Sequence, residues 1–162
     1  MQCVILAAGE GSRMRPLTSS RPKVMLPLVG KPMLEHLIRN VREAGIKEII
    51  IVVGYKEEAI REYFGDGRSF GVSITYVVQR KQLGTADALR TAEPFITDTF
   101  LMLNGDMVIE IGDLQKICRT EAPVMAVTTT THPQDFGVGT LSKGKIASLE
   151  EKSPNPKSDI IN

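Results

Sequence analysis

The sequence predicts an α/β fold in three layers, with a mostly parallel, Rossmann-like sheet between helices. Along its first two-thirds, short apolar runs alternate with segments that carry apolar residues at helical spacing, and this alternation is typical of βαβ units. The run Glu48–Val53 is β-branched almost throughout and lacks the polar alternation of a half-exposed strand. A strand of that kind is covered on both faces, as in a parallel sheet between helices.

The individual elements follow from apolar runs, helical spacing and stop signals. Pro32 fits the first turn of a helix whose apolar spacing runs to Val41, and Gly45 ends it. The other expected helices are Lys56–Phe64, Thr85–Glu93 with Thr85 as N-cap, and Asp113–Arg119. The expected strands are Gln2–Ala7, Glu48–Val53, Val72–Val78 and Phe100–Leu103, and then, in a β-rich final third, Val124–Thr131, Val138–Leu141 and Lys145–Leu149.

Length, composition and charge favour one domain that binds small molecules. The 162 residues are 42% hydrophobic, which is enough for a core. With 20 basic and 19 acidic residues, a net charge of +1 gives no bulk attraction to nucleic acid or to an anionic membrane. Cys3 and Cys118 lie in apolar stretches and are expected to be reduced core thiols. Because no apolar run approaches the ~20 residues of a membrane span, we expect a soluble, cytoplasmic protein.

The loop after the first strand carries the ingredients of a polyphosphate site. It matches neither a dinucleotide fingerprint, because Met14 stands where a glycine is needed, nor a Walker A loop. Its glycines nevertheless allow close backbone approach, and Arg13, Arg15, Arg21 and Lys23 supply positive charge. Ligands in open α/β sheets bind at the carboxyl ends of the strands, where this loop emerges. A solvated basic loop remains the alternative.

This loop also resembles a known signature. The run from Leu6 to Thr18 (LAAGEGSRMRPLT), followed by RPKVMLP at 21–27 and Lys31-Pro32, resembles that of the sugar-1-phosphate nucleotidylyltransferases. The resemblance implies a nucleotide-diphospho-sugar transferase type of fold, with residues 1–162 as the nucleotidylyltransferase domain. It implies that the nucleotide contacts Leu6, Ala8, Gly9 and Gly11 and that Arg13 and Lys23 hold the triphosphate charge, with Lys23 nearer the reacting α-phosphate.

A second segment, QRKQLGTADAL from Gln79 to Leu89, resembles the base-reading element of the same family, and most closely that of archaeal enzymes with a second, acyltransferase domain. The resemblance implies that Gln79 and the backbone near Gly84 and Thr85 bind a pyrimidine edge. An amide suits that edge because it carries a donor and an acceptor. Without the resemblance, the Gly84-Thr85 pair is better explained as a turn and helix cap.

Asp106 follows the strand at Phe100–Leu103 in the run Asn104-Gly105-Asp106. Capping of a turn would explain it. The resemblance instead implies a ligand for Mg²⁺, an ion usually held by one or two carboxylates and substrate phosphates.

The last third resembles the sugar side of the family's site. Gly137 lies in an F-G-V stretch, and Glu151-Lys152 resembles an E-K-P element in which Ser153 displaces the proline. The resemblance implies that Gly137 contacts the sugar, that Glu151 binds its hydroxyls and that Lys152 binds its phosphate. Asn162 matches the first residue of a sugar-binding N-x-G motif.

The expected reaction is attack of a sugar 1-phosphate, of the glucose or N-acetylglucosamine type, on UTP or dTTP, with release of pyrophosphate. Guanylyl or cytidylyl transfer is one alternative, and Gln79 stands against it. A non-catalytic nucleotide-binding regulatory subunit is another, against which Arg13, Lys23 and Asp106 all stand. Because Ile160-Ile161 begin a further strand and no second metal carboxylate is recognisable, we expect an incomplete enzyme with little turnover and a tendency to form homo-oligomers.

Overall fold

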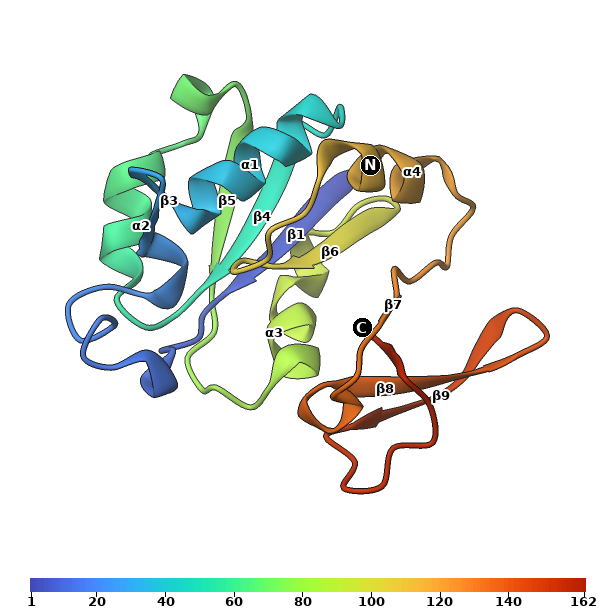
Figure 1. Ribbon diagram of the computed structural model, residues 1–162. Helices are drawn as coiled ribbons and strands as arrows, with labels where there is room; N and C mark the ends of the chain where they lie inside the picture. The colour runs from blue at the N-terminus through green and yellow to red at the C-terminus, as the bar shows by residue number, and fades with distance from the viewer. The chain divides into compact units, whose positions relative to one another are not determined.

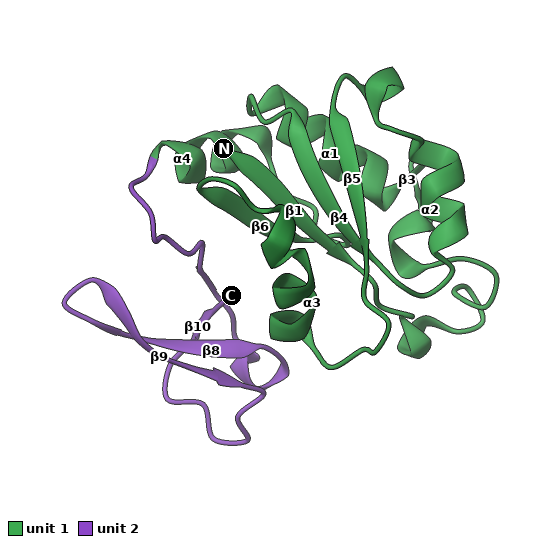
Figure 2. Ribbon diagram, turned by 180° about the vertical axis from the view of Figure 1, so that it is seen from behind, with its two compact units in different colours: residues 1–119 green, residues 120–162 purple.

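The computed structural model describes residues 1–162 and contains two compact units, residues 1–119 and 120–162. Figure 2 shows the two units in different colours. Each unit has its own four-stranded sheet, parallel in the first and antiparallel in the second.

The first unit is built on the predicted parallel sheet (Figure 1). Its strand order is β5 (Ser73–Val78), β4 (Glu48–Val53), β1 (Gln2–Ala7) and β6 (Phe100–Asn104). All three pairings are parallel, so the carboxyl ends of the strands lie at one edge of the sheet.

Helices cover both faces of this sheet and form the outer layers. Helices α1 (Met33–Glu43), α2 (Glu57–Phe64) and α4 (Ile111–Arg119) contribute to one apolar cluster with alternate side chains of the strands, such as Ile5 and Ile51. Helix α3 (Thr85–Ala92) packs Ala88 and Ala92 against the other face. The predicted three-layer α/β architecture is therefore confirmed.

The bounds of most elements agree with the sequence pattern. Strands β1 and β4 have the predicted bounds, and α1 ends just before Gly45, whose φ is +98°. The prediction that Thr85 caps α3 is wrong. Gly84 takes the N-cap position with a φ of 101°, and Thr85 is the first helical residue.

Several short elements have no counterpart in the sequence analysis. They are the hairpin of β2 (Pro27–Leu28) and β3 (Lys31–Pro32), and the 3₁₀ helices Ser12–Met14, Lys23–Met25, Arg68–Phe70, Glu93–Phe95 and Pro133–Asp135. Such single turns bury few apolar residues and leave no periodic pattern.

The second unit is antiparallel, with the order β7 (Thr128–Thr129), β10 (Ile160–Ile161), β8 (Gly137–Ser142) and β9 (Lys145–Glu151). The prediction of a strand over Val124–Thr131 is wrong for most of that length. Only Thr128 and Thr129 pair, with the two residues of β10. The length of β7 follows from the two-residue partner strand β10, and the apolar content of β7 does not reveal that partner.

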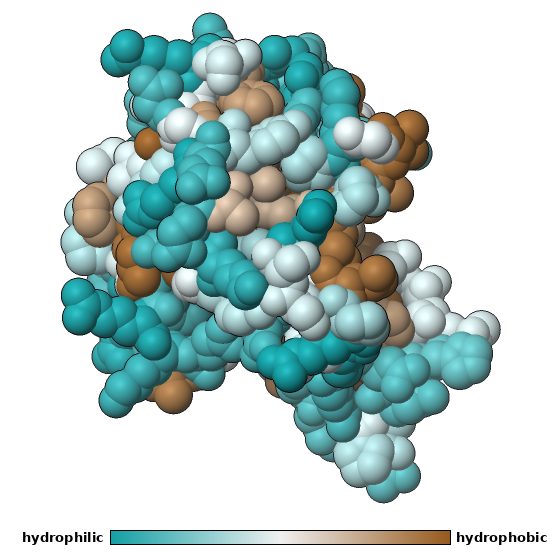
Figure 3. Space-filling model, turned by 90° about the vertical axis from the view of Figure 1, so that its left-hand side faces the viewer, coloured by the Kyte–Doolittle hydropathy of each residue, from teal (hydrophilic) through white to brown (hydrophobic).

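The exposed apolar side chains include Val29, 90% exposed, and Leu17, 62% exposed. On the face seen in Figure 3, apolar residues form groups separated by polar ones. None of the helices has the length and apolar content needed to cross a bilayer.

Candidate active site

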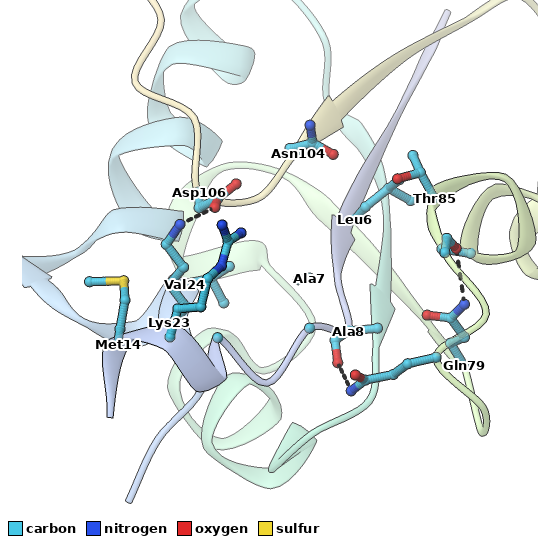
Figure 4. Close-up of a pocket in the computed structure, with 16 residues that line it drawn as sticks. Leu6, Ala7, Ala8, Met14, Lys23, Val24, Gln79, Thr85, Asn104 and Asp106 are labelled. Atoms are coloured by element: carbon cyan, nitrogen blue, oxygen red, sulfur yellow. Dashed lines mark hydrogen bonds and ion pairs between the residues drawn. The ribbon is translucent and has the colours of Figure 1, made fainter. Parts of the chain in front are cut away.

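A cavity of about 720 Å³ lies within the first unit, at the carboxyl ends of its parallel strands (Figure 4). Three segments far apart in the sequence meet there: the end of β1 with its loop, the segment after β5, and the end of β6. The lining residues are Leu6, Ala7, Ala8, Gly9, Gly11, Arg13, Met14, Lys23, Val24, Gln79, Gln82, Gly84, Thr85, Ala88, Asn104 and Asp106. Every residue that the family resemblance assigned to the nucleotide, the triphosphate charge or the metal is among them, whereas Arg15 and Arg21 of the same loop are not.

The loop after β1 is folded tightly around Gly11, whose φ of 66° lies in the left-handed region. A Cβ added there would lie 2.9 Å from Lys23 Cβ and 3.3 Å from Thr18 Cγ2. Thr18 is fully buried and donates a hydrogen bond from Oγ1 to the Gly11 carbonyl, at 3.0 Å. Glycine therefore allows Lys23 and the buried Thr18 to approach the loop, and this approach fixes its shape.

The charged groups of the cavity are Arg13, Lys23 and Asp106. Lys23 Nζ donates to Asp106 Oδ2 at 2.5 Å, and the two side chains are 35% and 36% exposed. Arg13 makes no ion pair or side-chain hydrogen bond within the structure. The charge of Arg13 is thus unpaired, and the charge of Lys23 lies beside the Asp106 carboxylate. Two positive charges in one cavity suit a polyanionic ligand.

The opposite wall of the cavity is formed by the segment after β5. Gln79 is only 6% exposed, and its Nε2 lies 2.8 Å from Asp87 Oδ2 and 3.4 Å from the Gly84 carbonyl oxygen. Gln82 reaches back to β1 and donates to the Ala8 carbonyl at 2.9 Å. Hydrogen bonds therefore hold the segment both internally and to the end of β1 (Figure 4).

Sequence reasoning missed several lining residues, among them Gln82 and Asn104. Both lie inside motifs that it had singled out, but neither spacing nor residue type marked them. Asn104 is brought to the cavity because the next residue, Gly105, donates its N–H to the Leu6 carbonyl at 2.8 Å. A Cβ on Gly105 would lie 3.0 Å from that oxygen, a tight contact that glycine avoids.

The residues predicted for the sugar phosphate lie in the second unit, and three of them are close together. Gly137 pairs with Glu151, and a Cβ on Gly137 would meet Asn162 Oδ1 and Glu151 Oε2. Lys152 follows Glu151 with a φ of 48° and donates its N–H to the Phe136 carbonyl at 2.9 Å. Their juxtaposition supports a common role, and that role remains a prediction.

The donor set around Asp106 fits a magnesium ion. Asp106 is the one carboxylate that lines the cavity, and its Oδ1 accepts no hydrogen bond within the structure. No group of three His, Cys, Asp or Glu side chains that could hold a metal occurs among residues 1–162. Mg²⁺ is commonly bound through one or two carboxylates, with phosphates and waters completing its shell.

A buried carboxylate outside the cavity serves the packing of α1. Glu35 is 3% exposed and accepts hydrogen bonds from Tyr63 Oη at 2.5 Å and Arg39 Nε at 2.7 Å. Burial alone raises the pKa of Glu35, but the hydrogen bonds from Tyr63 and Arg39 lower it, and the net pKa is below the usual 4.5.

The two thiols also lie outside the cavity. Cys3 on β1 is fully buried and Cys118 on α4 is half-buried. Burial raises the pKa of both thiols, and proximity to Cys118 raises that of Cys3 further. Thiols that resist ionisation in this way are poor nucleophiles, as expected of core residues.

The chain is similar in sequence to proteins of known name. The chain is 43% identical over 165 residues to the bifunctional protein GlmU of Methanococcus maripaludis (strain C7), a match that covers 100% of this chain and 38% of that protein. It is 38% identical over 168 residues to the UTP–glucose-1-phosphate uridylyltransferase AglF of Haloferax volcanii, covering 99% of this chain and 69% of that one. The chain thus spans well under half the length of the GlmU relative.

A solved structure shares the fold. A Bacillus anthracis protein described as a glucose-1-phosphate thymidylyltransferase, in complex with sucrose, superposes with a TM-score of 0.85 at 30% identity. The match covers 99% of this chain and 68% of that one. The nucleotidyl transferase family matches residues 2–162. The family match, the similar sequences and the shared fold agree. The chain therefore belongs to the nucleotidyl transferase family, as the resemblance of its first loop predicted.

Proposed function

We propose that this protein transfers a nucleotidyl group from UTP or dTTP to glucose 1-phosphate or N-acetylglucosamine 1-phosphate and releases pyrophosphate. The observation that carries the proposal is that the triphosphate loop, the base segment and Asp106 line one cavity. Its volume of about 720 Å³ lies within the range of small-molecule sites. Relatives named for sugar-1-phosphate substrates support the choice of acceptor.

The chemistry needs positioning and charge stabilisation more than proton transfer. An oxygen of the sugar phosphate forms a bond to the α-phosphorus, and the bond from that phosphorus to the bridging oxygen of the β-phosphate breaks, so that pyrophosphate leaves with the electron pair. Because the attacking oxygen is already anionic, no side chain has to act as its base. The work of the protein is to align the reactants and offset their charge.

The residues of the cavity divide this work. The Gly9–Arg13 backbone wraps the triphosphate, while the side chains of Arg13 and Lys23 offset its charge. Lys23 is paired with Asp106 in the structure. A bound triphosphate therefore competes with this carboxylate for the lysine.

Asp106 is the residue that would hold Mg²⁺, through a carboxylate that already faces the cavity. The ion, when bound, supplies positive charge to the phosphate oxygens. In the second unit, Glu151 and Lys152 are assigned to the sugar hydroxyls and the sugar phosphate, with Gly137 and Asn162 beside Glu151.

A pyrophosphate-release assay on the full-length protein tests the proposal. UTP, dTTP, CTP and GTP are each offered with glucose 1-phosphate and N-acetylglucosamine 1-phosphate in the presence of Mg²⁺, and Arg13→Ala serves as the impaired control. The expected result is release with UTP or dTTP that depends on a sugar phosphate. Faster release with CTP or GTP contradicts the pyrimidine assignment, and UTP binding without release contradicts the transferase assignment.

A further inference from the structure

The side-chain amide of Gln79 can adopt only one orientation, for a chemical reason. Its nitrogen side faces two groups that can only accept hydrogen bonds, the Asp87 carboxylate at 2.8 Å and the Gly84 carbonyl at 3.4 Å. If the amide were flipped, its oxygen would face two other oxygens. Both N–H groups are therefore engaged by acceptors of the protein itself, and the amide oxygen is left for the cavity.

Backbone contacts hold this arrangement in place. The Gln79 N–H donates to the Val53 carbonyl, at the end of β4, at 2.8 Å. The Gly84 carbonyl also accepts the Ala88 N–H at 3.1 Å and so belongs to the first turn of α3. Figure 4 shows the Gln79 nitrogen turned to the Gly84 carbonyl and the Gln79 oxygen on the side of Leu6 and Ala8.

We infer that Asp87 is a positioning residue that makes Gln79 an acceptor-only reader of the base, and so selects uracil or thymine over cytosine. The inference rests on the proposed function, because it concerns the nucleotide in the same cavity. Uracil and thymine carry an N–H at ring position 3, which the fixed oxygen can accept. Cytosine carries an unprotonated nitrogen there, and two acceptors that face each other repel.

Asp87 contributes to this selectivity without lining the cavity. Of the two contacts at the Gln79 nitrogen, the one to Asp87 is the shorter. A carboxylate can only accept a hydrogen bond, whereas an asparagine side chain could rotate and present its N–H group instead. Without it, only the 3.4 Å contact to Gly84 opposes a flip. A flipped amide would turn its donors toward the base and suit cytosine.

The test compares affinities for UTP, CTP and inorganic tripolyphosphate, by calorimetry in the presence of Mg²⁺, in wild type, Asp87→Ala and Asp87→Asn. In Asp87→Ala we expect UTP affinity to fall roughly tenfold, as for a misplaced buried polar partner, while CTP affinity holds or rises. Asp87→Asn, which keeps the side-chain volume, is expected to shift the UTP-to-CTP ratio in the same direction by roughly threefold. Tripolyphosphate affinity should not change, because the phosphate loop is intact.

A matched control separates positioning from a second role of Asp87, the favourable charge in the first turn of α3. Ala86→Asp in the Asp87→Ala background restores that charge at an exposed neighbour outside the cavity. We expect it to leave the UTP-to-CTP ratio as low as in Asp87→Ala. Recovery of the ratio in this double variant, or an unchanged ratio in both single variants, overturns the inference. A wild type that does not prefer UTP or dTTP to CTP instead overturns the proposed function.

Discussion

Replacement of Gly11 by alanine should destabilise the protein and distort its phosphate loop. Alanine at a φ of 66° carries the cost of a left-handed conformation, about 1–2 kcal/mol. Its Cβ would lie 2.9 Å from Lys23 Cβ and 3.3 Å from Cγ2 of the buried Thr18, so overpacking adds about 1–3 kcal/mol. We therefore expect the free energy of unfolding, measured in urea, to fall by about 2–5 kcal/mol.

Gly9→Ala is the matched control in the same loop. A Cβ on Gly9 meets no atom within 4 Å, and Gly9 is not among the glycines with positive φ. Its free energy of unfolding should stay within about 0.5 kcal/mol of wild type. UTP binding should nevertheless weaken, because the methyl group enters space that lines the cavity. Wild-type stability in Gly11→Ala, or equal losses in the two variants, would refute this account of the loop.

Three further substitutions test separate parts of the structure. Asp106→Asn should lower kcat far more than it raises KM in steady-state assays, since the carboxylate that would hold Mg²⁺ beside the reacting phosphates is lost while the base contacts remain. An unchanged kcat removes Asp106 from the mechanism. Gln79→Glu should weaken UTP and dTTP binding roughly tenfold to a hundredfold, because a second carboxylate would then face Asp87 in place of an N–H donor. Calorimetry that shows unchanged affinity would exclude Gln79 as the residue that binds the base. Glu35→Gln should lower the free energy of unfolding by about 1–2 kcal/mol at pH 7 through the loss of charge-assisted hydrogen bonds. The pKa of Glu35 is depressed in the folded state. That loss should therefore shrink as the pH falls from 4.5, where the carboxyl group of the unfolded chain takes up its proton, through the lower pKa of the folded protein. Urea titrations that show a pH-independent difference would contradict it.

The parallel sheet could be predicted from the sequence because a strand that is buried on both faces consists of a continuous run of apolar residues. Strand β4 is apolar and β-branched at every position after Glu48, and its predicted bounds are those observed. The grouping of the nucleotide-side residues was readable for a related reason. Loops that follow parallel strands emerge at one edge of the sheet, so motifs after β1, β5 and β6 meet there.

Features that depend on partners distant in the sequence could not be read in this way. Strand β7 is limited to two residues by its pairing with β10. The role of Gln82 depends on a carbonyl 74 positions away, at Ala8. Asp87 lies in the first turn of α3, and only its 2.8 Å contact with Gln79 connects it to the residue predicted to bind the base.

The central claim is that one cavity holds the triphosphate at the loop after β1 and the base at Gln79. A crystal structure of the protein with a non-hydrolysable UTP analogue and Mg²⁺ tests it most directly. The account predicts phosphates along the Gly9–Arg13 backbone and the uracil N–H within hydrogen-bonding distance of the Gln79 oxygen. A nucleotide bound outside this cavity, or one bound in the reverse direction with its phosphates at Gln79, would contradict it.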